Sequence, residues 1–483
     1  MNYALFCTFA VIMVIIIAVL FYFSLLFVIS RWTSRRATNT TFYRADRRSP
    51  WYMVAFGMIG ASISGVTFVS VPGMILHTQM TYLQMCMGFI LGYVVVAFGL
   101  LPLYYRLNLT SIYGYLGQRL GRRSYKTGAS FFLLSKMMGA AVRFYVVCII
   151  LQRFVFEPMG VPFVATVVGM VLLIWLYTRH GGMKTLVWTD SFQTFCLFAA
   201  LLLIIYKVTK DLGLTMGEAV AMIDENALSR VFVFDDWVSK QYFWKQFASG
   251  VFIVLVMTGV DQDMMQKNLT CKTLRGAQKD MCTYGVAFLP ANLLFLSLGV
   301  LLATLAQQSG LSLPANGDDL LPTYVSQAGT LVMVLFTLGI VAASFSSADS
   351  ALTSLTTIYC VDIKERAADE GLRKRVHVAM CGLFVLFILL FKAVNSTSLI
   401  DAVYIIASYT YGPLLGLFAY GLLTHKAVDD RWVPYIAIAS PLLSYVINWG
   451  VGQTTGYQFG YELLMLNALL TFVGLWMSRR VRL

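Results

Sequence analysis

Residues 342–350 read A-A-S-F-S-S-A-D-S and lie in the middle of an apolar stretch. They place four hydroxyl groups and one carboxyl group at the depth of a membrane interior, where an Asp costs roughly 2.5–3.5 kcal/mol to insert. Hydroxyl and carboxylate oxygens are hard ligands, which suit a small hard cation. Ser346, Asp349 and Ser350 are spaced i, i+3 and i+4, so they share one helix face. The stretch predicts a cation site within the membrane.

The composition of the whole chain is that of an all-α polytopic membrane protein. Of its 483 residues, 59% are hydrophobic and 12% are charged, and the mean hydropathy is +0.74. Apolar runs recur along the chain, each long enough to cross the roughly 30 Å hydrocarbon core, and their non-alternating pattern predicts helices. We expect about 13 transmembrane helices, near residues 5–30, 51–76, 81–105, 127–153, 161–178, 185–207, 242–265, 281–307, 329–360, 376–394, 400–424, 432–450 and 461–478.

The net charge of +13 could suggest a nucleic-acid partner, but the placement of the basic residues argues against one. Most of the 36 Lys and Arg residues fall in alternate loops, at 31–48, 106–126, 179–184, 267–279, 364–375, 426–431 and 479–482. The loops between them are mainly acidic. An excess of basic residues marks the cytoplasmic side of a membrane protein. We therefore expect the lipid bilayer as a partner, the N-terminus outside and the C-terminus in the cytoplasm. The short loops favour a bacterial plasma membrane.

Two expected spans carry small and hydroxylated residues that interrupt an apolar helix. Residues 60–67 read G-A-S-I-S-G-V-T, and residues 246–250 read Q-F-A-S-G. Paired interruptions at matching places in two halves of a chain indicate a transporter built from inverted repeats, with its binding site near the middle of the membrane. Unwound backbone at such a point frees carbonyl oxygens for a cation. The alternative is that these glycines only allow helices to pack closely.

Four segments, in order and with similar spacing, resemble the sodium:solute symporter family. They are S-I-S-G-V-T-F at 62–68, G-G-M-K-T-L-V-W-T-D-S-F-Q at 181–193, D-Q-D-M-M-Q-K-N-L-T-C-K at 261–272 and A-A-S-F-S-S-A-D-S-A-L-T-S-L-T-T at 342–357. The resemblance spans nearly the whole chain and implies a LeuT-like core of ten helices in two inverted five-helix repeats. The repeats would cover 51–207 and 242–424, joined by an extracellular loop at 208–241. Peripheral segments would lie at 1–50, with one helix, and at 425–483, with two.

The same resemblance implies where the coupling ion, sodium, binds. The common sodium site of the family joins carbonyls of the broken first core helix to a carbonyl and two adjacent hydroxyls of the eighth core helix. The matching residues here are Gly60, Ile63, Ala343, Ser346 and Ser347. About five neutral oxygens also suit a weakly held monovalent ion that must leave again. Adjacent serines occur in membrane helices for packing alone as well. We expect one or two sodium ions and no organic cofactor.

Some members of the family have a second sodium site, which maps here to Asp190, Ser346, Asp349 and Ser350. Asp349 departs from the family pattern, because a hydroxyl residue is expected at that position. Two carboxylates at one site would either raise the affinity for a cation or hold a proton between them, so proton coupling is an alternative to sodium. A further alternative is that Asp349 pairs structurally with Lys136 or with another helix.

The substrate prediction starts from Arg143 and Lys136, which lie seven residues apart in one span and so nearly on one helix face. An Arg within a span faces the protein interior, and its planar fork suits a carboxylate. Sialic-acid symporters of this family place an Arg on this helix, together with hydroxyls of the broken helix and a Gln on the next helix. The substrate-binding candidates are therefore Ser62, Ser64, Thr67, Gln84 and Arg143, with Phe247 or Trp244 as an aromatic wall. Arg143 could instead pair with Asp190 or Asp349 as scaffold.

These residues predict a sodium-coupled symporter for a small polar organic solute, with an acidic sugar or related carboxylate as the leading candidate. A neutral sugar, polyol, nucleoside or amino acid, carried with sodium or protons, is the alternative. Because one sodium ion and a monoanion together carry no net charge, voltage-driven uptake of an anion would need two sodium ions. The four histidines form no H-x-x-x-H or Ser–His arrangement, which argues against an enzyme. A channel fits the interrupted helices less well. A sensor is not expected because the sequence shows no C-terminal signalling domain, and no obligate protein partner is evident.

Overall fold

The computed structural model describes residues 2–35, 38–394, 399–455, 457 and 459–478. Within these residues the chain is helical, and the only extended pairing is an isolated bridge between Ser49 and Cys271. Eight unbroken helical stretches are long and apolar enough to cross a membrane. They are α1 (Asn2–Thr33), α5 and α6 (Tyr82–Arg106), α8 with its short continuation (Arg122–Met159), α10 (Met183–Asp211), α14 (Leu274–Gln308), α16 with its last turn (Thr330–Ile363), α17 (Glu370–Val394) and α20 (Val433–Thr455).

Three further spans consist of two helices that meet at a sharp bend. The pair α3 (Trp51–Ser62) and α4 (Gly65–Thr78) is bent by 61°. The segment α12 (Phe243–Val254), which continues to Gly259, meets α13 (Gln262–Asn268) at 70°. The pair α18 (Leu399–Thr410) and α19 (Gly412–Leu423) is bent by 47°. Bends of this size inside apolar spans expose backbone groups that need other partners.

Two shorter apolar helices, α9 (Phe163–Gly181) and α21 (Leu463–Met477), lie where the sequence predicts the remaining spans. The total of about 13 spans stays a prediction, because these two helices are short for a full crossing. Four short helices connect the longer ones: α2 (Asn39–Arg44), α7 (Gly114–Arg119), α11 (Met216–Glu225) and α15 (Leu320–Gln327). Of the basic segments named above, Arg36 and residues 479–482 lie outside the described residues.

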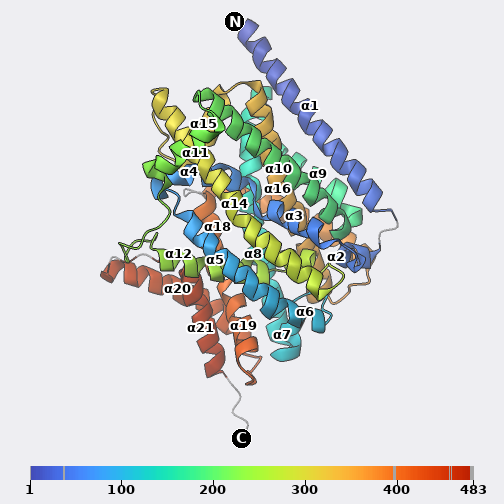
Figure 1. The fold of residues 1–483 in the computed structure, drawn as a ribbon. Helices are drawn as coiled ribbons and strands as arrows, with labels where there is room; N and C mark the ends of the chain where they lie inside the picture. The colour runs from blue at the N-terminus through green and yellow to red at the C-terminus, as the bar shows by residue number, and fades with distance from the viewer. Residues whose placement is uncertain (1, 36–37, 395–398, 456, 458, 479–483) are drawn as a thin grey trace.

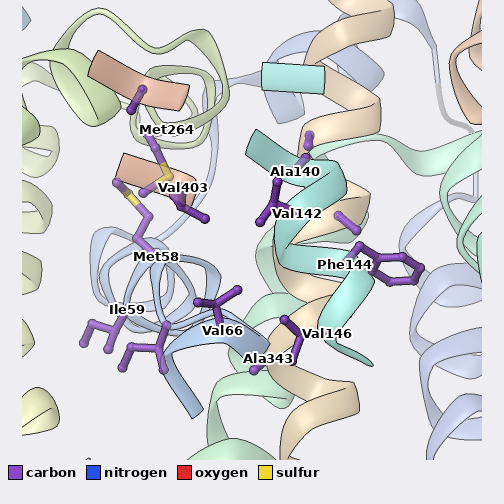
Figure 2. Packing of buried hydrophobic residues seen from close by; sticks show 14 of the residues in the cluster. Met58, Ile59, Val66, Ala140, Val142, Phe144, Val146, Met264, Ala343 and Val403 are labelled. Atoms are coloured by element: carbon purple, nitrogen blue, oxygen red, sulfur yellow. The ribbon is translucent and has the colours of Figure 1, made fainter. Parts of the chain in front are cut away.

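The bent helices lie inside the bundle, and single helices flank it. Figure 1 shows α1 along one side of the molecule and α20 and α21 on another. Helix α10 packs against both α3 and α16, and α12 packs against α5. Around the first bend, buried apolar side chains of α3, α4, α8 and α16 form one continuous core that includes Met58, Val66, Phe144 and Ala343 (Figure 2). This apolar packing holds the bend against α16.

The first interruption predicted from the sequence is confirmed, and the second lies elsewhere. Helix α3 ends at Ser62 and α4 begins at Gly65, inside the predicted stretch 60–67. By contrast, residues 246–250 lie within the continuous helix α12, and its bend falls later, at 260–261. A Cβ atom on Gly250 would lie 2.2 Å from the backbone oxygen of Met85 in α5. The glycine at this place therefore serves close helix packing, which was the alternative interpretation.

Candidate ion and substrate site

The bend between α3 and α4 leaves backbone oxygens without their helical partners. Ile63 leaves helical geometry with φ −78° and ψ 87°. The N–H of Ser64 donates to the oxygen of Ser62 at 3.1 Å and does not continue the helix. Among the residues that the structure describes, no backbone N–H donates to the oxygens of Gly60, Ala61 or Ile63. These oxygens are available to a side chain or a cation, as the chemistry of a sodium site requires.

Helix α16 presents a hydroxyl to this bend. The Ser347 Oγ donates to the backbone oxygen of Ala61 at 2.9 Å and lies 3.2 Å from that of Ala343. Two carbonyl oxygens and one hydroxyl from two different helices therefore meet at one point. Of the residues predicted for the first sodium site, Ala343 and Ser347 lie there, and Ala61, which the prediction omits, supplies the contacting carbonyl of the bend.

The other predicted members of the first site face a neighbouring helix. Gly60 packs on α10, where a Cβ atom would lie 1.9 Å from Thr194 Oγ1. Ser346 donates its hydroxyl to Asp190 Oδ1 of α10 at 2.8 Å. No described contact joins the backbone oxygen of Ile63 to α16. The Ser347 hydroxyl is therefore at the bend, whereas the Ser346 hydroxyl is directed at α10.

The residues predicted for a second sodium site lie close together but are already bonded to other groups. Asp190 is completely buried, and its Oδ2 lies 2.7 Å from Nζ of Lys267, which is only 2% exposed. The other Asp190 oxygen, Oδ1, accepts the hydrogen bond from the Ser346 hydroxyl. The ammonium group of Lys267 thus balances the charge of Asp190 at the place where a second cation would bind.

Asp349 lies on the same face of α16 but has a different set of partners. Its Oδ2 accepts a hydrogen bond from the Tyr177 hydroxyl at 2.7 Å, and its Oδ1 accepts one from Ser350 at 3.3 Å. No ion pair of Asp349 occurs among the described residues. Asp349 therefore does not pair with Lys136, which has other partners, but it does pair with another helix through Tyr177 of α9, which agrees with the other half of that alternative.

Lys136 of α8 instead holds the bend between α12 and α13. Its Nζ lies 2.7 Å from Asp263 Oδ2 and 3.3 Å from Asp261 Oδ2. Asp261 also accepts the Tyr411 hydroxyl at 2.6 Å and the backbone N–H of Asp263 at 2.8 Å. The carboxylate therefore caps α13 and at the same time ties three helices together.

A cavity lies next to the α3–α4 and α12–α13 bends, and Tyr411 at the α18–α19 bend lines it as well. Its volume is about 100 Å³. Of the residues predicted at the substrate site, the cavity is lined by Ser62, Ser64, Thr67 and Arg143. Ala61 and Ser347 line it as well, so the cavity borders the sodium candidate. Arg143 is half-buried and forms no hydrogen bond or ion pair with any described residue, so its scaffold pairings with Asp190 or Asp349 are not found.

Three side chains predicted at the substrate site, Gln84, Phe247 and the alternative Trp244, lie elsewhere. The side chain of Gln84 bonds to the backbone oxygen of Gln241 at 2.9 Å and to the N–H of Val233 at 3.1 Å, so it ties the loop before α12 to α5. Phe247 stacks on Phe243 with ring centroids 5.7 Å apart, and Trp244 beside it is 59% exposed. None of the three predicted side chains lines the cavity.

A sequence model of the sodium:solute symporter family matches residues 42–430. The chain belongs to this family. It is 25% identical over 412 residues to the sodium/sialic acid symporter NanT of Aliivibrio fischeri, which covers 81% of this chain and 79% of that protein. It is 27% identical over 405 residues to the sodium-dependent multivitamin transporter of Oryctolagus cuniculus, which covers 78% of this chain and 60% of that protein.

The fold of this symporter agrees with that assignment. A solved structure of a Na⁺-coupled sialic acid symporter superposes with a TM-score of 0.81 at 20% identity and covers 98% of this chain and 97% of that one. The all-α, LeuT-like fold predicted from the sequence is therefore confirmed. The chain is a multi-pass sodium-coupled transporter and not an enzyme, as its family membership establishes.

The sequence analysis missed the aromatic walls of the cavity. Seven Tyr and Phe residues line it: Tyr82, Phe89, Tyr93, Tyr284, Phe288, Tyr404 and Tyr411. Those of α5 are spaced seven and four residues apart, and the two of α14 are spaced four apart, so each set lies on one helix face. This periodicity is visible in the sequence, but it does not distinguish a cavity wall from ordinary core packing.

A second cavity lies beside the first, and one pair of rings separates them. Tyr82 lines both cavities, and its hydroxyl lies 3.0 Å from that of Tyr404. Tyr404 stacks on Tyr461 at 4.7 Å, and the Tyr461 hydroxyl donates to Asp401 at 2.6 Å. The first cavity, which Arg143 lines, is thus bounded by tyrosine contacts at one end and by the Lys136 ion pairs at the other.

Proposed function

We propose that this symporter imports a small organic acid, best represented by an acidic sugar such as sialic acid, together with sodium by alternating access. The observation that carries the proposal is the position of Arg143. This guanidinium lines the cavity next to Ser347 and has no carboxylate partner among the described residues. A bidentate bond to a substrate carboxylate would satisfy it. The sialic acid named for the NanT relative supports this class of substrate.

We place the coupling sodium ion between the α3–α4 bend and α16, with oxygens of Ala61, Ala343 and Ser347 as ligands. The resemblance to the family adds Gly60, Ile63 and Ser346 to this proposed set. The second site at Asp190, Ser346, Asp349 and Ser350, and with it a ratio of two sodium ions to one anion, stays a prediction. The Lys267 ammonium lowers the need for a second cation there.

The tyrosine contact at one end of the cavity is a proposed gate, and opening on that side would part the hydroxyls of Tyr82 and Tyr404. The ion pairs of Lys136 with Asp261 and Asp263 bound the other end and are proposed to stay intact through the cycle. The basic loops support an orientation with the N-terminus outside and the C-terminus in the cytoplasm, in a bacterial inner membrane. Accessibility of single introduced cysteines at the two chain ends to a membrane-impermeant reagent tests this orientation.

Uptake into proteoliposomes tests the proposed function. We expect an inward sodium gradient to drive uptake of radiolabelled N-acetylneuraminic acid. Arg143→Lys should weaken it roughly 10- to 100-fold, because Lys cannot replace a bidentate fork. Arg153→Lys is the matched control, since Arg153 lies at the end of the same helical stretch, exposed and over the ring of Phe154 at 5.9 Å.

Two outcomes would contradict the proposal. One is carboxylate uptake that Arg143→Lys leaves unchanged. The other is sodium-driven uptake of neutral sugars, nucleosides or the vitamins named for the rabbit relative in preference to acidic sugars.

A further inference from the structure

Asp263 has one carboxylate oxygen without a hydrogen-bond partner in the part of the chain that the structure describes. The residue lies in the first turn of α13, lines the cavity and is 3% exposed. Its Oδ2 lies 2.7 Å from Lys136 Nζ, whereas its Oδ1 is buried and has no hydrogen-bond partner among the described residues. A buried acceptor without a donor is costly, so a donor that a ligand brings would be bound favourably there.

Both carboxylate oxygens of the neighbouring Asp261, by contrast, have hydrogen-bond partners. Its two oxygens are shared among Lys136, the Tyr411 hydroxyl and the first backbone N–H groups of α13. Asp261 is therefore a structural carboxylate, and Asp263, which also lines the cavity, is the one of the two with a carboxylate oxygen that has no hydrogen-bond partner among the described residues. The sequence D-Q-D alone does not separate these two roles, because both residues are acidic and lie at the same bend.

The positions of Asp263 and Arg143 favour a ligand of sugar size. Lys136, which forms an ion pair with Asp263, and Arg143 are seven residues apart on α8, so their backbone positions lie about 10 Å apart along the helix axis. A ligand that carries its carboxylate and its hydroxyl groups several bonds apart suits this spacing better than an acid of two or three carbons.

The charges of the cavity decide between a neutral and a cationic donor. The four charged residues that line it, Lys136, Arg143, Asp261 and Asp263, sum to zero. A monocarboxylate with neutral hydroxyl groups, taken up with one sodium ion, keeps the loaded cavity neutral. An amino acid zwitterion with one sodium ion would leave a net positive charge in a low-dielectric site, which is unfavourable.

We infer that Asp263 Oδ1 accepts a hydrogen bond from a hydroxyl group of the substrate whose carboxylate binds Arg143. The substrate is then a polyhydroxylated monocarboxylate of sugar size. This inference rests on the proposed function and adds to it a residue that selects the hydroxylated end of the acid.

Titration calorimetry on the purified full chain in saturating sodium tests this assignment. The first step compares N-acetylneuraminate, gluconate and glucuronate with lactate and alanine on the wild type. The second step uses mono-deoxy analogues of the acid that binds most tightly, on wild type, Asp263→Asn and Ser135→Ala. Ser135 is the matched control because it also lines the cavity, but its hydroxyl already donates to the Phe131 oxygen at 2.6 Å. Asp263→Glu, which keeps the charge that faces Lys136, replaces Asp263→Asn if that variant does not fold.

We expect one analogue to bind the wild type and Ser135→Ala about tenfold or more weakly than its parent acid, and to show no such loss on Asp263→Asn. The comparison of analogue with parent cancels any uniform effect of the altered charge. Equal losses on wild type and Asp263→Asn for every analogue would overturn the inference, as would lactate or alanine that binds as tightly as the sugar acids. If the affinity for sugar acids depends on Arg143 but the contribution of no hydroxyl group depends on Asp263, this inference alone fails. If no carboxylate binds the wild type, both this inference and the proposed function fail.

Discussion

Two of the bends that border the cavity, α3–α4 and α12–α13, satisfy their backbone in opposite ways. At the α3–α4 bend the groups are neutral: a serine hydroxyl of α16 faces the carbonyl oxygen of Ala61 at 2.9 Å. At the α12–α13 bend they are charged: Asp261 caps α13, and Lys136 neutralises it from α8. The two bends differ in sharpness by only 9°, 61° against 70°, so the difference lies in their side chains.

This difference assigns different tasks to the two halves of the fold. Carbonyl and hydroxyl oxygens hold an alkali ion weakly and release it again, as a transport cycle requires. A buried ion pair with hydrogen bonds is costly to break and keeps its bend fixed. We therefore interpret the first bend as the place where an ion comes and goes, and the second as a permanent link among α8, α13 and α19. The first prediction below tests the permanent link.

The largest effect should follow from Asp261→Ala. The substitution removes the cap of α13 and leaves Lys136 with Asp263 as its only remaining partner, so we expect a loss of about 3–5 kcal/mol in the free energy of unfolding. Thermal unfolding of the purified protein, monitored by intrinsic fluorescence, measures the change. A variant as stable as the wild type would show that the second bend does not depend on this ion pair.

A smaller loss of stability should follow from Gly250→Ala. The new methyl group would press on the backbone oxygen of Met85, and overpacking of this kind costs about 1–3 kcal/mol. The sodium dependence of uptake should not change, because residues 246–250 form no bend. Gly99→Ala is the matched control, since a Cβ atom there would meet nothing within 4 Å. A shift in sodium affinity for Gly250→Ala would restore the discarded view that this stretch is part of the ion site.

The smallest effect should follow from Phe247→Leu. Phe247 stacks outside the cavity, so substrate affinity should stay within about twofold of wild type. Tyr404→Phe is the contrasting variant, because its hydroxyl bonds Tyr82 between the two cavities. Equilibrium binding of the labelled acid measures both. A large loss for Phe247→Leu would mean that the aromatic wall predicted from the sequence forms in another state of the cycle.

The sequence predicted the first bend well because its signal is local. Hydroxylated residues between Gly60 and Gly65 have few roles in an apolar span, and the helix breaks there. The second bend was predicted at the wrong place. The small residues that let α5 and α12 pack closely, such as Gly250, look the same in the sequence as those of a helix break. The true break at Asp261 depends on Lys136, a residue 125 positions earlier in the chain. No local pattern reports such a partner, and the same holds for Lys267 beside Asp190.

Measured sodium affinity tests the central claim most directly. Sodium-induced thermal stabilisation, or binding of ²²Na⁺, should be compared for wild type, Ser347→Ala and Ser344→Ala. Ser344 lies three residues before Ser347 on α16, and its hydroxyl has no described partner. We expect Ser347→Ala to weaken sodium binding by at least about tenfold, because even groups that only orient a metal ligand contribute a factor of about ten to affinity. Ser344→Ala should leave sodium binding unchanged. Equal sodium affinity in Ser347→Ala and wild type would contradict an ion site at the first bend.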